Sequence, residues 1–227
     1  MNTKTSLTNK VLFIDFDGQF IKAKKEFERN YERYWVSVAD ASEKLGRPIS
    51  IEKLKELWDE DQKNGNKSET IIEILVNDLN FHEPSLATET HHVLINKFGH
   101  EYEIDHNFVD ALLQLPEHKK IIVTHAPEVW IKHWLSRIQR ALTIDDIVCI
   151  KTIGLCKRSD PKTYPFLLEK YDVNAKNTVM IEDTEANLHL ANAINIPAVM
   201  YGPKQAEAGY PSFNCPFEMA QHIKEIH

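Results

Sequence analysis

Glycine is scarce in this chain, with only seven among 227 residues. Most of the glycines stand where a helix or strand is expected to end: Gly18, Gly46, Gly65, Gly99, Gly154 and Gly202. This spacing predicts helices joined by short loops. No internal repeat and no low-complexity segment is present, so a repeat architecture is not expected.

Long apolar runs are also lacking. No run approaches the roughly 20 residues that a membrane-spanning helix needs, and the segment MNTKTSLTNK at the start has no apolar core of the kind a signal peptide carries. The three cysteines, Cys149, Cys156 and Cys215, form no CxxC motif and cannot all pair. We therefore expect a cytosolic protein in a reducing compartment, without a membrane partner.

Positive charge is the third deficit. The 27 Lys and Arg residues are outnumbered by 34 Asp and Glu residues, so the formal net charge is −7. Without a long basic run, the chain is a poor candidate for binding a nucleic acid polymer. The hydrophobic content of 42% and the charged content of 27% are ordinary for a globular protein. The length suits one large α/β domain or a domain with a sizeable insertion.

The stretch VLFIDFDGQF is the most informative one near the start. Residues 11–14 are four β-formers in a row, typical of a strand buried on both faces of a parallel sheet. If the extended backbone continues, Asp15 and Asp17 point to the same side. Two carboxylates so close raise each other's pKa unless a cation or a shared proton separates them. Gly18 permits the backbone turn that brings both into one site.

An all-helical segment of about 80 residues is expected next, with no strand between Phe20 and Gly99. One long helix is predicted from an apolar face and ends at Gly46 and Pro48. That face consists of Phe20, Phe27, Tyr31, Tyr34, Val38, Ala41 and Leu45. Ser50, Ser68 and Pro84 are each expected to begin a further helix.

After Glu103, short apolar strands alternate with helices. The expected strands lie in KIIVTHAP, DIVCIKTI, NTVMIEDTEAN and, as the last strand, PAVMY. One intervening helix carries Trp130 and Trp134, which we expect on its core face, and another is capped by Asp160 with Pro161 at its first position. The alternation predicts a parallel sheet whose strand ends meet at one edge. Ligands bind at that edge in open α/β sheets.

Polar residues follow each predicted core strand and converge on this edge. They are Asp15, Asp17 and Gly18, then Thr124 and His125, then Lys157 and Arg158, and finally Glu182 and Asp183. The four carboxylates make an oxygen cage suited to Mg²⁺, which usually meets substrate phosphate. Asp15 could then attack phosphorus, while Asp17 could protonate the leaving oxygen and later activate a water. Taken alone, Thr124 could simply cap the next helix. Glu182 and Asp183 could simply be acids in a first helical turn, which the helix dipole favours.

With these motifs in place, the chain resembles the haloacid dehalogenase-like (HAD) superfamily. The resemblance covers roughly residues 10–20 and 104–204. It implies a Rossmann-like α/β core of residues 1–19 and 104–227, with a parallel sheet. It also implies an all-helical cap of residues 20–103 inserted after the first strand. The implied activity is Mg²⁺-dependent hydrolysis of a phosphate ester through an aspartyl-phosphate.

The resemblance also implies a role for individual residues. Asp15 would be the nucleophile and a metal ligand, and Asp17 would be the general acid/base with its backbone carbonyl on the metal. Asp183 would ligate Mg²⁺, and Glu182 would assist directly or through water. Thr124, Lys157 and Gly18 would contact the phosphate. The EDTEAN segment looks most like phosphatases of small metabolites, including nucleotide 5′-monophosphatases.

The chain departs from the family pattern in three places. Gln19 stands where Thr or Val is usual, and His125 stands where Asn is frequent. The basic residue of the third motif is displaced, so Lys157 is the first choice, followed by Arg158 and then Lys162. The histidines have no zinc-ligand spacing, and a dedicated zinc site is not expected.

The leading interpretation is a phosphatase for a small phosphorylated substrate, acting as a monomer or homodimer. A sugar-phosphate mutase on the same core is one alternative. Another is a HAD-like binding or regulatory module that has lost turnover. A hydrolytic dehalogenase is disfavoured, because that chemistry needs neither Mg²⁺ nor an acid at Asp17.

Overall fold

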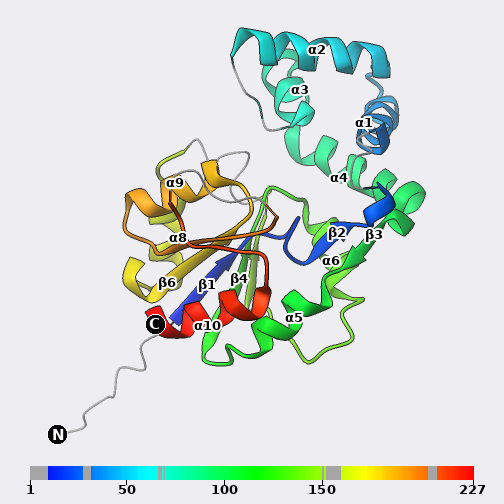
Figure 1. The fold of residues 1–227 in the computed structure, drawn as a ribbon. Helices are drawn as coiled ribbons and strands as arrows, with labels where there is room; N and C mark the ends of the chain where they lie inside the picture. Colours follow the sequence, from blue (N-terminus) through cyan, green and yellow to red (C-terminus); the bar gives the residue numbers. More distant parts are fainter. Residues whose placement is uncertain are drawn as a thin grey trace, which may run out of the picture.

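The computed structural model describes residues 10–27, 32–65, 68, 70–149, 151, 160–203 and 209–227. Its centre is a six-stranded parallel sheet in the order β5-β4-β1-β6-β7-β8 (Figure 1). The strands are β1 (Lys10–Ile14), β4 (His118–Val123), β5 (Asp146–Val148), β6 (Thr178–Glu182), β7 (Ala198–Tyr201) and β8 (Ser212–Phe213). The prediction of an α/β fold built on a parallel sheet is confirmed.

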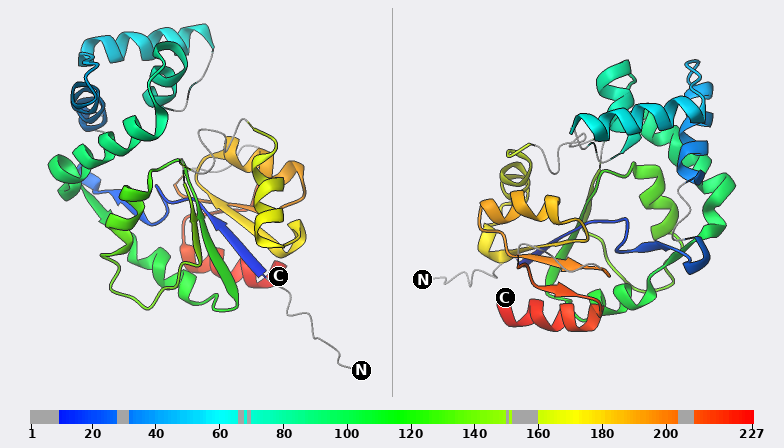
Figure 2. Two further views of the ribbon diagram at one scale, coloured as in Figure 1. Left: turned by 180° about the vertical axis from the view of Figure 1, so that it is seen from behind. Right: turned by 45° about the horizontal axis from the view of Figure 1, so that its top comes forward.

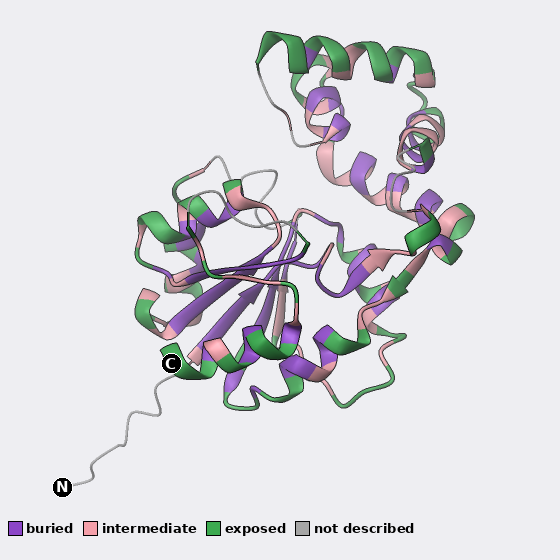
Figure 3. Cartoon of the chain, in the orientation of Figure 1, coloured by how far each residue is buried: buried purple, intermediate pink, exposed green. Residues whose placement is uncertain are grey.

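Strand β1 lies inside the sheet and is buried on both faces, as the apolar run predicted (Figure 3). Leu12 and Ile14 pack on one side, in a core shared with α5 (His106–Leu113), α6 (Glu128–Leu135) and α10 (Pro216–Ile226). Val11 and Phe13 pack on the other side, against α8 (Thr163–Tyr171) and α9 (Glu185–Ala193). Alternation along a strand produces this division. Each fully buried side chain contributes roughly 1.5–3 kcal/mol.

Four helices form a separate unit over the edge where the strands end (Figures 1 and 2). They are α1 (Glu32–Lys44), α2 (Ile51–Asn64), α3 (Ile71–Leu79) and α4 (Glu83–Val93), followed by η2 (Leu94–Phe98) and η3 (Gly99–Glu101). The unit has its own apolar core, which includes Val38, Leu54, Leu75 and Leu86. Ser50 caps α2 as predicted, because its side chain accepts a hydrogen bond from the Lys53 N–H.

The prediction of one long helix beginning at Phe20 is wrong. Residues Ile21–Ala23 form strand β2, which pairs antiparallel with β3 (Tyr102–Ile104), and a short 3₁₀ turn η1 (Lys25–Phe27) follows. The first helix begins only at Glu32. The strand was missed because its partner lies about 80 residues further along the chain, and a local periodicity carries no information about that pairing.

Several boundaries also differ from expectation. Thr70 rather than Ser68 caps α3, while Ser68 hydrogen-bonds to Asp61 instead. Helix α8 begins at Thr163 rather than at Pro161. The carboxylate of Asp160 does accept a bond, from the backbone N–H of Lys162. The strand β7 is not the last one, because β8 and α10 follow it, and a 3₁₀ turn η4 (Ala175–Asn177) precedes β6.

The described ranges also bear on the expectations about apolar helices and cysteines. None of the helices in them is both long enough and apolar enough to cross a bilayer. Cys149 and Cys215 are free thiols there, and Cys156 lies outside the described residues.

Trp130 and Trp134 both belong to the apolar core on the sheet face that α5, α6 and α10 cover, as predicted.

A buried histidine sits at the start of β4. His118 is 3% exposed, and its ring stacks on His227 with a centroid distance of 5.4 Å and an interplanar angle of 8°. Burial lowers the pKa of His118 from its ordinary value of 6.5 to about 4, although nearby Glu117 opposes that shift. Burial also lowers the pKa of His227. Burial therefore favours the neutral form of both imidazole rings in this stack.

This stack predicts a pH dependence of stability. The unfolded chain takes up a proton on His118 below pH 6.5, whereas the folded chain resists it until about pH 4. The free energy of unfolding should therefore fall as the pH drops through this window, by on the order of 1–3 kcal/mol from this residue. His118→Gln should flatten the fall in chemical denaturation series. The exposed His106 provides a control, and equal profiles for His118→Gln and His106→Gln would contradict the prediction.

Candidate active site

Three carboxylates meet at the carboxyl ends of β1 and β6, which are neighbours in the sheet. Asp15 directly follows β1, and its backbone N–H donates to the Ile181 carbonyl at 3.0 Å. Glu182 ends β6 and Asp183 follows it. One oxygen from each of the three side chains lies within 4.8 Å of the others. The sheet thus brings together residues that are about 167 positions apart in the chain.

The turn after Asp15 fits closely against this cluster. Gly18 has a φ of +77°, and its N–H donates to the Ile21 carbonyl at 3.0 Å. A Cβ at this position would lie 2.3 Å from the Asp183 Oδ2 atom. Only glycine combines the left-handed backbone with this close approach. Gly18 therefore leaves the space in which the Asp183 carboxylate sits.

Glu182 is fully buried and held by donors on both carboxylate oxygens. Its Oε2 accepts the Asp183 N–H at 2.8 Å, and its Oε1 accepts the side-chain amide of Asn187. Asn187 lies on α9, is 2% exposed, and was not singled out in the sequence. The only sequence signal for Asn187 was its place at the end of the EDTEAN segment, two residues after Glu185. These bonds fix the orientation of a carboxylate that borders the cluster.

The chemistry of the cluster fits Mg²⁺. Its donors are hard carboxylate oxygens from Asp15, Glu182 and Asp183, and the first two residues are buried. Anions crowded in a low-dielectric environment repel each other strongly. A divalent cation is the group that relieves this repulsion while keeping all three ionised.

Thr124 lies at the end of β4, the strand beside β1, as the sequence predicted. It is 2% exposed, and its N–H donates to the Val148 carbonyl at 3.0 Å. Its Oγ1 accepts the Ala126 N–H at 3.1 Å. A hydroxyl that accepts one bond still carries a proton to donate. Thr124 is thus a fixed donor at the same edge of the sheet.

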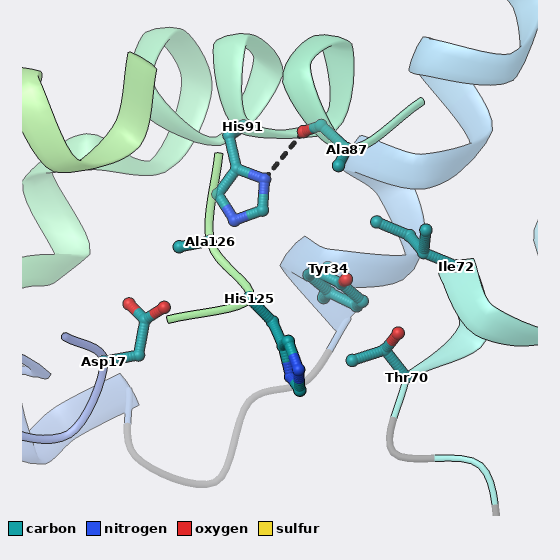
Figure 4. A pocket seen from close by; sticks show the side chains of 8 residues that line it. All are labelled: Asp17, Tyr34, Thr70, Ile72, Ala87, His91, His125 and Ala126. Atoms are coloured by element: carbon teal, nitrogen blue, oxygen red, sulfur yellow. Dashed lines mark hydrogen bonds between the residues drawn. The ribbon is translucent and has the colours of Figure 1, made fainter. Parts of the chain in front are cut away.

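Asp17 has a different environment from the cluster. It lines a cavity of about 200 Å³ between the sheet edge and the helical unit (Figure 4). Its Oδ1 accepts the indole N–H of Trp130 at 2.8 Å. The residues lining the cavity are Asp17, Tyr34, Thr70, Ile72, Ala87, His91, His125 and Ala126. The cavity therefore joins one predicted catalytic residue to side chains of α1, α3 and α4.

The lining of this cavity is largely uncharged. Burial lowers the pKa of His91 to about 4, and its Nδ1–H donates to the Ala87 carbonyl at 2.7 Å. Burial, and secondarily the charge of Asp17, raises the pKa of Tyr34. His91 is thus a neutral imidazole and Tyr34 a neutral phenol near pH 7. Asp17 is the acidic side chain among the described lining residues, and no Lys or Arg is among them.

Gln19, an unusual residue at its position, turns away from the cavity lining. It is fully buried, and its Nε2 donates to the backbone carbonyl of Tyr201 at 3.2 Å. This bond ties the loop after β1 to the end of β7. The role of Gln19 in the structure is therefore to hold the loop.

The basic residue of the third motif is not located here, because Lys157 and Arg158 lie outside the described residues. The third choice, Lys162, is an exposed residue at the start of α8. His125 lines the same cavity as Asp17, and its ring points away from the Asp17 carboxylate (Figure 4).

No protein-family model and no curated protein sequence matches the chain. Solved structures match it over nearly their full length. A HAD phosphatase from Thermococcus onnurineus has a TM-score of 0.62 and 17% identity, covering 94% of this chain and 97% of the other. CbbY from Rhodobacter sphaeroides, in complex with phosphate, has a TM-score of 0.63 and 14% identity, with coverages of 93% and 96%.

A further neighbour is a protein from Thermotoga maritima provisionally assigned as a beta-phosphoglucomutase. It has a TM-score of 0.59 and 18% identity, with coverages of 96% and 100%. At such low sequence identities, these similarities show a shared fold only. The chain has the HAD-like fold, with a Rossmann-type α/β core, as the sequence motifs predicted.

The fit of Gly18 against Asp183 gives a testable prediction. Gly18→Ala should push the Asp183 carboxylate out of the cluster, because the added Cβ would overlap Oδ2 in a strained backbone. Mg²⁺ affinity measured by titration calorimetry should fall by about tenfold or more. Gly46→Ala is the control, because Gly46 also has a positive φ but no atom lies within 4 Å of its added Cβ. Unchanged Mg²⁺ affinity in Gly18→Ala would contradict the assignment.

Proposed function

We propose that this chain is a Mg²⁺-dependent phosphatase that hydrolyses a small phosphorylated metabolite through an aspartyl-phosphate. One observation carries the proposal. Asp15 lies in a three-carboxylate cluster, while Asp17, two residues on, lines a neighbouring cavity. A nucleophile beside a metal cluster and an acid/base beside a leaving-group cavity are the two parts that phosphate-ester hydrolysis requires.

In this proposal, residues 1–19 and 104–227 form the catalytic core and residues 20–103 form the cap. The separate apolar core of the helical unit supports the division. So does the pairing of β2 with β3, because it brings the two chain crossings, near residues 20 and 103, side by side. The cap would cover the strand ends and exclude water from the site.

The metal would be held by Asp15, Asp183 and the backbone carbonyl of Asp17. Glu182 would act directly or through water, while its bonds to Asn187 and the Asp183 N–H keep it in place. The cation would neutralise charge on the phosphoryl oxygens. Thr124 would donate its hydroxyl proton to one of those oxygens, and Lys157 is the proposed cation of the third motif. The N–H of Gly18 already donates to Ile21, so Gly18 would contribute mainly the space for Asp183 beside the phosphate.

The two aspartates would share the chemistry. A carboxylate oxygen of Asp15 attacks phosphorus, and the bond from phosphorus to the leaving oxygen breaks. Protonated Asp17 gives its proton to that oxygen, so an alcohol departs. Asp17, now a carboxylate, takes a proton from a water molecule as the water attacks phosphorus and the bond between phosphorus and the Asp15 oxygen breaks. Inorganic phosphate leaves, and both aspartates return to their starting states.

The cavity beside Asp17 would receive the leaving group. Its volume of about 200 Å³ suits a small organic alcohol, and no described lining residue is a Lys or Arg that would recruit a second anionic group. Tyr34, Thr70 and His91 offer neutral polar atoms, and Ile72 and Ala87 offer apolar surface. We therefore favour a leaving group without further negative charge, such as the nucleoside of a nucleoside monophosphate.

Phosphoryl transfer within a sugar phosphate is the second candidate. The full-length likeness to the protein provisionally assigned as a beta-phosphoglucomutase supports it. A mutase would return the phosphoryl group to another hydroxyl of the substrate and release little free phosphate. A binding or regulatory module would hold Mg²⁺ without either product.

The nucleophile assignment has a direct test. Wild-type protein should release phosphate from nucleoside monophosphates, sugar phosphates or p-nitrophenyl phosphate with Mg²⁺, and should stop with EDTA. Asp15→Asn should lower kcat by roughly 10³-fold or more, because an amide oxygen is a poor nucleophile. Asp78→Asn, an exposed position on α3, is the matched control and should keep full activity.

Each outcome separates the candidates. Phosphate release lost only in Asp15→Asn supports the phosphatase, whereas isomerised sugar phosphate without phosphate release supports the mutase. Mg²⁺ binding with neither product would favour the binding module. Full phosphate release by Asp15→Asn would reject the nucleophile assignment.

The cavity assignment has its own test. Ala87 lines the cavity from α4 and is 1% exposed, so Ala87→Ile should fill part of the space. We expect kcat/KM for a nucleoside monophosphate to fall by about tenfold or more, since a bulky group no longer fits. Glycerol phosphate, whose leaving group is small, should be hydrolysed nearly as before and serves as the internal control. Equal losses for both substrates would place the leaving group elsewhere.

A further inference from the structure

Trp130 lies on α6 and reaches the proposed acid/base from the core side. It is 2% exposed, and its Nε1–H donates to the Asp17 Oδ1 at 2.8 Å. An indole nitrogen only donates, so this bond can end only on an acceptor oxygen of Asp17. We propose that Trp130 is a positioning residue for Asp17, which holds the carboxyl group in one orientation for proton transfer to the leaving group. This inference rests on the phosphatase function proposed above.

The position of Asp17 explains why such a bond matters. Asp17 stands in the loop after β1, just before the left-handed Gly18, and it lines the cavity (Figure 4). A carboxyl group on a loop has more than one rotamer, and proton transfer requires one of them. A donor on Oδ1 holds the carboxyl group in one rotamer, as proton transfer to the leaving oxygen requires.

The indole itself is held by rings from three elements. Its ring makes edge contacts with His91 of α4, Tyr102 of β3 and Trp134 of its own helix, at centroid distances of 5.2, 5.3 and 5.6 Å. The hydroxyl of Tyr102 in turn accepts a bond from the Arg33 Nε at 2.9 Å. Contacts on several sides leave Trp130 little freedom to rotate. The orientation of Asp17 is thereby tied to the helical unit and to β3.

The same helix supplies a matched comparison. Trp134 lies one turn later, is 3% exposed and belongs to the same apolar core. Its Nε1–H has no hydrogen-bond partner in the part of the chain that the structure describes. The two tryptophans are therefore alike in burial and packing and differ in the bond to Asp17. A purely structural role predicts similar effects of replacing either one.

Leaving groups of different acidity separate the two roles. Nitrophenolate departs from p-nitrophenyl phosphate without a proton, whereas the alkoxide of benzyl phosphate must be protonated as it leaves. The two esters are similar in size, so the cavity treats them alike. The value of kcat/KM reports the steps up to loss of the alcohol, which is where the proton of Asp17 is used.

The experiment compares Trp130→Phe with Trp134→Phe on both esters. Trp130→Phe should lower kcat/KM for benzyl phosphate by roughly 10- to 100-fold and that for p-nitrophenyl phosphate by less than about threefold. Trp134→Phe should change both esters by the same small factor. If Trp130→Phe also changes both esters by one factor, Trp130 has only a packing role and the inference is wrong.

An effect of these substitutions on folding can be distinguished from an effect on catalysis. Thermal unfolding of both variants reports any loss of packing. If Trp130→Phe does not fold, benzothienylalanine at position 130 keeps the shape of the indole and replaces only the N–H by sulfur, and the same selective loss is expected. Wild-type protein that releases no phosphate from these two esters, nucleoside monophosphates or sugar phosphates would overturn the phosphatase proposal and this inference together. Wild-type protein active only on p-nitrophenyl phosphate would show that no proton donor acts, which would overturn the acid role of Asp17 and this inference while phosphatase activity itself would stand.

Discussion

The crowding of three carboxylates at the ends of β1 and β6 is the constraint on which the rest of this structure depends. Asp15, Glu182 and Asp183 offer oxygens within 4.8 Å of one another, and two of the residues are buried. Such a group is costly without a cation and without fixed neighbours. The bonds of Glu182 to Asn187 and the Asp183 N–H, and the glycine that makes room for Asp183, meet the second requirement.

Two aspartates that are almost adjacent in the chain therefore have different surroundings. Asp15 directly follows its strand and joins the cluster, whereas Asp17 lies on the loop and borders a cavity with no Lys or Arg among its described lining residues. A nucleophile must be an anion and an acid must carry a proton, so the roles proposed for Asp15 and Asp17 need different environments. The loop from Asp15 to Gly18 creates that difference within four residues.

The helical unit contributes more than a cover. Its helix α4 supplies His91 and Ala87 to the cavity, and His91 also touches the ring of Trp130, which binds Asp17. The small β2–β3 sheet completes the connection, because β2 follows the Asp17 loop and β3 carries Tyr102. A shift of the helical unit would therefore change the position of Asp17, because the packed aromatic rings between them deform little.

The sequence by itself determined the parallel α/β fold, the helical insertion and the carboxylates at the strand ends, because strand burial, helix periodicity and turn residues are local signals. It did not reveal β2 and β3, whose pairing spans about 80 residues, or α10 behind the last expected strand. It also treated Trp130 and Trp134 alike, since an equal spacing on one helix face cannot tell which indole meets Asp17. Only the tertiary structure decided that, because a hydrogen bond between residues 113 positions apart depends on how α6 packs against the loop after β1.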